Sequence, residues 1–131
     1  MTFSSPFAGR RSPFSSVIEE GTKSWVFVAQ ATECGRPRLS IEFEAPFNVV
    51  GMRRCKSGAR LEAEHSSRIG LTPKRFCNDL LESPPPALPP TSSMPFSMGQ
   101  YVTFSFIVDE DHTPAEGFKA IVCVYCRSSF D

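Results

Sequence analysis

The sequence lacks a long apolar run and an excess of charge of either sign. Its longest apolar stretches are WVFVA at 25–29 and AIVCVYC at 120–126, much shorter than the ~20 residues with which a helix crosses a bilayer. Fourteen Lys and Arg balance fourteen Asp and Glu, so no general electrostatic attraction to nucleic acid or to anionic membranes is expected. We therefore predict no membrane span and no nucleic-acid partner.

The sequence also lacks the residue patterns of the common enzyme and metal sites. No nucleophile elbow, zinc-protease helix motif, P-loop or dinucleotide fingerprint is present. His65 and His112 stand apart in polar segments, which favours solvated loop histidines, and the adjacent Asp109, Glu110 and Asp111 are expected to be solvated as well. We predict no enzymatic activity, no cofactor and no metal.

A secretory signal is not visible at the amino terminus. Residues 1–17 are polar and rich in Ser and Pro, with single Phe residues at positions 3, 7 and 14. They contain no apolar core of the length found in such signals, about 7–15 residues. An extracellular chain with this sequence is therefore expected to be a fragment or to begin in an unusual way.

Four segments alternate apolar and polar residues with the period of two that is typical of β-strands. They are 24–30, 39–44, 101–108 and 118–125, and they are rich in β-branched and aromatic residues. Twelve prolines favour short strands over long helices, so we predict an all-β domain, a sandwich or a barrel. The inward side chains are predicted to be Trp25, Ile41, Phe43, Phe104, Phe106, Phe118 and Ala120.

One further segment has helix-like spacing. In KRFCNDLLE at 74–82, Phe76, Leu80 and Leu81 recur at helical intervals after Pro73. The proline-rich run that follows limits a helix here to about two turns. A turn is therefore favoured, with a short helix as the alternative.

Several short motifs occur along the chain in a characteristic order. They are SPF at 12–14, Trp25 at the start of a strand, LSIEF at 39–43, Cys55, RFCN at 75–78, VTFSF at 102–106 and GFKA at 117–120. In type and order they resemble the motifs of a CUB domain, an extracellular β-sandwich module of jelly-roll type. The segment 75–121 carries the most specific part of the resemblance.

The resemblance implies a domain organisation and a function. Residues 12–126 would form one antiparallel β-sandwich of jelly-roll type, with a flexible segment at 1–11 and a tail at 127–131. CUB domains are non-catalytic and bind protein or glycan ligands, and inter-strand loops are the usual place for such contacts. We thus expect an extracellular or secreted interaction module. The alternatives are an intracellular, reduced β-domain with a Pro-rich loop, and the accessory, non-catalytic part of an extracellular protease.

The resemblance also implies a disulfide between Cys55 and Cys77, which stand at the positions of the third and fourth cysteines of the family. The first family disulfide is missing, because no cysteine precedes the first predicted strand. Five cysteines leave at least one without a partner in the chain. A second disulfide from Cys34 to Cys126, or to Cys123, is left open.

The CUB domains that bind calcium use three acidic positions, of which this chain keeps only Asp109. Gly58 stands at the second position, and the first falls within 48–50, which reads Asn-Val-Val. Because calcium takes about six to eight oxygen ligands, we predict partner binding without calcium. The predicted partner-binding region is a basic strip instead, formed by Arg53, Arg54, Lys56 and Arg60.

Overall fold

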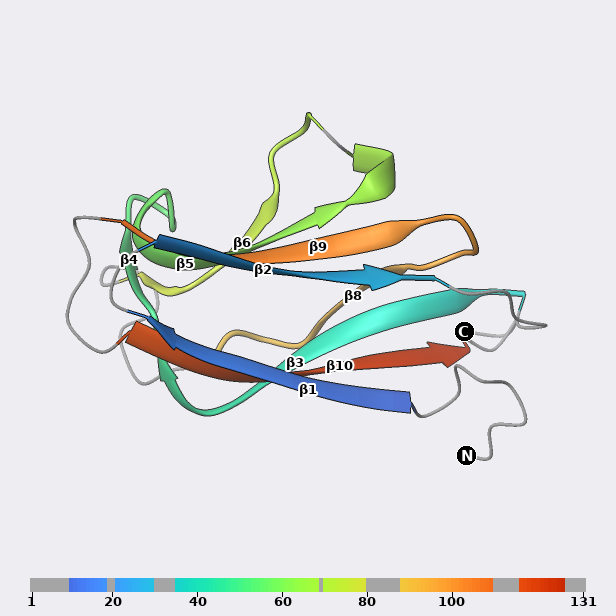
Figure 1. The fold of residues 1–131 in the computed structure, drawn as a ribbon, viewed down its shortest axis with the longest axis horizontal. Coiled ribbons are helices and arrows are strands. Elements are labelled where there is room, and N and C mark those ends of the chain that lie inside the picture. Colours follow the sequence, from blue (N-terminus) through green and yellow to red (C-terminus); the bar gives the residue numbers. More distant parts are fainter. Residues whose placement is uncertain are drawn as a thin grey trace.

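In the computed structural model, β-strands are arranged in two layers (Figure 1). The structure describes residues 10–18, 21–29, 35–68, 70–79, 88–109 and 116–126. The strands are β1 (Arg10–Ile18), β2 (Gly21–Val28), β3 (Pro37–Asn48), β4 (Val50–Met52), β5 (Ser57–His65), β6 (Lys74–Phe76), β7 (Asn78–Asp79), β8 (Ser92–Pro95), β9 (Tyr101–Val108) and β10 (Glu116–Cys126). A 3₁₀ turn, η1 (Ser66–Arg68), follows β5. No helix in the described part of the chain is long and apolar enough to cross a membrane.

The two layers are β-sheets that pack face to face. One sheet has the strand order β1-β10-β3-β8, and the other has the order β2-β9-β5-β4-β7, with β6 also paired to β5. The pairs are antiparallel except for the short parallel contact between β4 and β7. The predicted all-β antiparallel sandwich is confirmed, whereas the jelly-roll class stays a prediction. Of the expected terminal segments at 1–11 and 127–131, Arg10 and Arg11 belong to β1, and the other residues lie outside the described ranges.

Burial follows the predicted alternation along the strands. In β9 every second side chain, from Val102 to Val108, is buried, and the side chains between them are half-buried. The predicted inward side chains that are buried are Ile41, Phe43, Phe104, Phe106, Phe118 and Ala120. Trp25 is only half-buried against the core, because β2 is an edge strand and one side of it has no neighbour in the sheet.

A cluster of aromatic rings joins an edge strand of one sheet to an edge strand of the other. The ring centroid of Phe14 in β1 lies 5.1 Å from that of Trp25 and 5.7 Å from that of Phe27, both in β2. It also lies 5.4 Å from the centroids of Phe104 and Phe118. Tilted and edge-to-face pairs at this spacing contribute about 0.5–1.5 kcal/mol each beyond area burial. Phe14 therefore holds the two layers together at β1 and β2, which are edge strands among the strands that the structure describes.

The segment predicted as a turn or a short helix is extended where it is described. Residues 74–79 contain β6 and β7, while 80–82 lie outside the described residues. β6 pairs with β5 in a register that places Phe76 in the core, and Arg75 forms an ion pair with Glu62 of β5 at 3.0 Å. The helical spacing was misleading, because burial of Phe76 and this cross-strand pair favour the extended conformation.

Candidate functional site

The tight turn between β4 and β5 has an unusual backbone. Arg53, Arg54 and Cys55 have φ angles of 57°, 59° and 62°, so three consecutive residues other than glycine are left-handed. The amide of Lys56 donates a hydrogen bond to the carbonyl oxygen of Met52 at 3.0 Å and closes the turn. Each left-handed L-residue costs roughly 1–2 kcal/mol, so the neighbouring structure must hold the turn in this shape.

A disulfide and two glycines hold this β4–β5 turn in place. Cys55 is bonded to Cys77, as predicted, with 5.8 Å between the two Cα atoms. Gly51 pairs with Gly58 across the two strands at the base of the turn. A Cβ atom on Gly51 would lie 2.7 Å from the sulfur of Cys77, and one on Gly58 would lie 2.8 Å from the carbonyl oxygen of Val50. No side chain fits at either position, so the strands approach closely beneath the turn.

The β4–β5 turn presents three cationic side chains to solvent. Arg53, Arg54 and Lys56 are all exposed, and they belong to the predicted basic strip. Residues 52–58 contain no acidic residue, so these charges create a local positive potential on a chain with no net charge. The turn therefore offers a compact cationic surface with a fixed backbone.

Arg60, the fourth residue of the predicted strip, lies apart from this surface. Its guanidinium is 3.1 Å from the carboxylate of Asp109 and 3.4 Å from that of Glu62. Glu62 in turn pairs with Arg75. The side chain of Arg60 is 16% exposed, so its charge is balanced within the sheet surface and is not presented with the other three.

Asp109 is the one acidic residue that this chain shares with the CUB calcium pattern, and its carboxylate is hydrogen-bonded to other groups of the protein. Its two carboxylate oxygens accept hydrogen bonds from the amide of Gly58 at 3.0 and 3.1 Å, and one also accepts from Arg60 at 3.1 Å. A guanidinium thus lies beside the carboxylate on which a cation would bind. Within the described ranges, no group of three or more His, Cys, Asp or Glu is placed to hold a metal ion; Glu110 and Asp111 lie outside these ranges.

The other cysteines are found at or near the end of β10, or outside the described residues. The thiol of Cys123 is free and half-buried, and Cys126 is disulfide-bonded. The free thiol of Cys123 shows that the alternative pairing of Cys34 with Cys123 was wrong. Cys34 lies outside the described residues, so its pairing with Cys126 stays a prediction.

His65 is buried at the end of β5, so the expectation of a solvated loop histidine was wrong for this residue. Its Nε2 lies 2.7 Å from the carbonyl oxygen of Pro95, and its Nδ1 accepts a hydrogen bond from the amide of Ser67 at 3.1 Å. Because that amide can only donate, Nδ1 carries no proton and Nε2 donates to Pro95. The ring thus links β5 to β8 through hydrogen bonds at both of its nitrogens. His112 lies outside the described residues.

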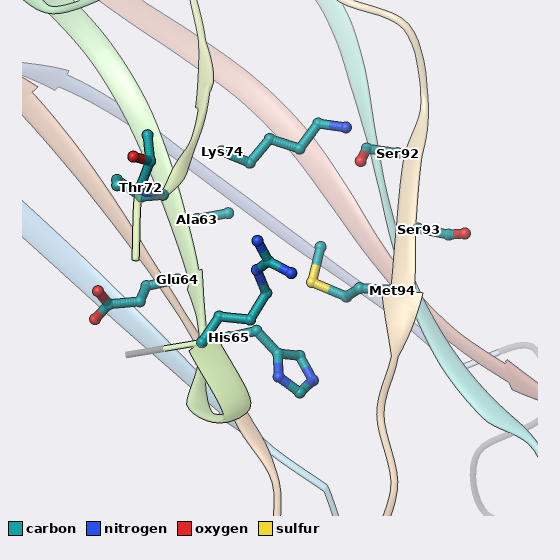
Figure 2. Close-up of a pocket in the computed structure, with 10 residues that line it drawn as sticks. Ala63, Glu64, His65, Thr72, Lys74, Ser92, Ser93 and Met94 are labelled. Atoms are coloured by element: carbon teal, nitrogen blue, oxygen red, sulfur yellow. The ribbon is translucent and has the colours of Figure 1, made fainter. Parts of the chain in front are cut away.

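A pocket of ≈ 280 Å³ lies between β6 and β8, next to His65 (Figure 2). Its lining includes Ala63, His65, Arg68, Lys74, Ser92 and Met94. The motifs of the sequence did not reveal it, because it depends on how β6 pairs with β5 and on where β8 lies. One feature of the sequence could have indicated the pocket. Lys74 and Phe76 are two positions apart, so in a strand both side chains lie on the same side.

Comparison of the chain with protein-family models, with curated proteins and with solved structures finds no match. Membership of the CUB family therefore stays a prediction that rests on the sequence motifs. The function is inferred below from the geometry of the described residues together with that resemblance.

Proposed function

We propose that the protein is a non-catalytic interaction module that binds an anionic partner through the β4–β5 turn. The partner is a sulphated glycan or an acidic protein surface. The observation that carries this proposal is the run of three left-handed residues that displays Arg53, Arg54 and Lys56 above a disulfide. A strained and cross-linked backbone is costly, and strain of this kind concentrates at functional sites.

The rigidity of the turn favours binding. A flexible basic loop loses conformational freedom when it binds, and this loss reduces the affinity. The β4–β5 turn has already lost that freedom on folding, because the Cys55–Cys77 bond and the close Gly51–Gly58 pair fix its backbone. Its exposed cations are thus presented to a partner at a lower entropic cost than the same charges on a mobile tail, and Arg54 also has an interaction within the protein.

The module resembles a CUB domain, and we infer that it acts outside the cell. Structural disulfides persist mainly in oxidising compartments, and the buried Cys55–Cys77 bond fits such a setting. Binding is independent of calcium, because Asp109 is already bonded to Arg60 and to the amide of Gly58. Two packed sheets are compatible with the jelly-roll arrangement of the CUB family. The proposed binding site does not depend on that arrangement.

The test is a charge-removal variant of the turn, compared with a control variant that loses the same charge elsewhere. In the test variant Arg53, Arg54 and Lys56 are replaced by glutamine. In the control the exposed cations Lys23, Arg36 and Lys119 are replaced by glutamine. Retention on immobilised heparin and on an immobilised acidic peptide is measured over a series of salt concentrations.

We expect the turn variant to lose about tenfold or more in affinity for one of the two ligands, and the control to lose much less. Exposed charges are screened over about 8 Å at physiological ionic strength, so wild-type binding should also weaken with salt. The ligand that shows this loss identifies the partner class. Equal losses in the two variants would mean that binding depends on overall charge, and the turn would then not be the site.

A further inference from the structure

The pocket between β6 and β8 is lined by two exposed cations, Lys74 and Arg68, that play no part in the proposed turn site. Strand register places Lys74 opposite Ala63, on the same side of β6 as the buried Phe76. The Lys74 side chain extends toward β8, where Ser92 and Met94 lie (Figure 2). Lys74 is exposed at the start of β6, so its ammonium group lies at the open side of the pocket.

The cations of this pocket have no acidic partner among the described residues. Lys74 and Arg68 form no ion pair with another described residue, and the Nζ of Lys74 lies 5.9 Å from the ring centroid of Phe76. The carboxylate of Glu64, also on the lining, points away from Lys74 and Ser92 (Figure 2). The interior thus combines positive charge and hydroxyl groups.

His65 keeps the walls of the pocket at a fixed separation. Its ring donates to the carbonyl oxygen of Pro95 at the end of β8 and accepts from Ser67 after β5. These bonds connect the two strands that face each other across the pocket. The pocket is therefore preformed, as small-molecule sites usually are.

We propose that this pocket binds a ligand of monosaccharide size that carries one carboxylate, that is, a sugar acid. The ammonium of Lys74 pairs with the carboxylate in a charge-assisted hydrogen bond. The hydroxyls of Ser92 and Thr72 bond to ring hydroxyls, and Met94 with Ala63 forms an apolar wall for the CH face of the ring. The volume, ≈ 280 Å³, lies just below the ~300–1,000 Å³ of typical ligand pockets, which suits one sugar ring.

This site is separate from the β4–β5 turn, although both bind negative charge. β5 starts at the turn and ends at His65 after nine residues, which corresponds to a separation on the order of 25 Å. The two sites therefore do not share a ligand group, and each can be lost without the other.

The test is an NMR titration of the ¹⁵N-labelled protein with sodium glucuronate. Neutral glucose is the control for the ring, and sodium acetate is the control for the carboxylate. Lys74→Gln removes the charge in the pocket, Ser92→Ala removes a hydroxyl, and Lys56→Gln removes a charge from the β4–β5 turn instead. We expect glucuronate to shift the amides of Ala63, Lys74 and Met94.

The expected affinity loss is about tenfold or more in Lys74→Gln, because a charge-assisted hydrogen bond is lost. Ser92→Ala should lose less, and Lys56→Gln should match the wild type. Glucose and acetate should each bind at least tenfold more weakly than glucuronate. The proposal is overturned if these amides do not move, if Lys74→Gln binds as well as the wild type, or if acetate binds as tightly as glucuronate.

Another role for Lys74 is to protect the edge of the sheet, since charged side chains on an edge strand, Lys especially, discourage pairing between molecules. If edge protection is the sole role of Lys74, the Lys74→Gln variant self-associates in size-exclusion chromatography, and the wild type does not bind glucuronate. This outcome would overturn the pocket proposal and leave the turn site intact. The turn variant, in contrast, should lose heparin binding and still bind glucuronate normally. That result would support two independent sites.

Discussion

Replacing both Cys55 and Cys77 by alanine should destabilise the protein by about 3 kcal/mol. The bond joins residues 22 positions apart, and closing a loop of this length removes roughly 11 cal/mol/K from the unfolded chain, or about 3 kcal/mol at 25 °C. Loss of two buried sulfur atoms adds to this cost. Release of strain in the left-handed turn acts in the opposite direction, since residues freed from the cross-link can leave the left-handed region.

The assay is urea unfolding followed by the fluorescence of Trp25, the single tryptophan of the chain. Trp25 packs against the core, so its emission reports loss of the sandwich. The free energies extrapolated to water are compared, because removal of a cross-link also changes the slope. Cys123→Ser is the control; its thiol is free and half-buried, so a change within about 0.5 kcal/mol is expected.

A loss of less than about 1 kcal/mol in the double alanine variant would refute this reasoning. It would mean that the unfolded chain is already restricted in this region, or that the strain of the turn offsets the entropy of the loop. In the first case the disulfide adds little stability to the fold, and in the second it still holds the turn in its left-handed shape. A second readout is heparin retention, which should fall in the double variant because the three cations are no longer held on a fixed backbone.

Two further predictions concern the base of the turn and its calcium independence. Gly51→Ala should destabilise by about 1–3 kcal/mol, because the new Cβ would lie 2.7 Å from the sulfur of Cys77 and 2.9 Å from the carbonyl oxygen of Ala59. Gly35→Ala is the control, since no atom lies within 4 Å of its added Cβ, and an equal effect of the two variants in urea unfolding would contradict the packing argument. Millimolar calcium should not change the melting temperature, because Asp109 is bonded to Arg60 and Gly58 and calcium takes about six to eight oxygens. Saturable heat of calcium binding at micromolar levels in calorimetry would contradict this prediction.

The fold class and most of the core could be predicted from local sequence. Alternation of side chains between two faces is a property of a single strand, so Ile41, Phe104 and Phe118 could be placed inward before any pairing was known. Trp25 was predicted inward for the same reason but is half-buried, because an edge position is a property of the sheet order and not of the strand.

Tertiary structure decided the rest of the candidate site. The basic residues of the predicted strip are close in sequence, yet pairing across strands separates Arg60, which lies beside Asp109, from the exposed turn. His65 appeared solvated in a polar segment, but it is buried, and the carbonyl oxygen of Pro95 at the end of β8 accepts a hydrogen bond from its ring. These outcomes depend on which strands become neighbours, and a local pattern carries no information about partners that are tens of residues away in the chain.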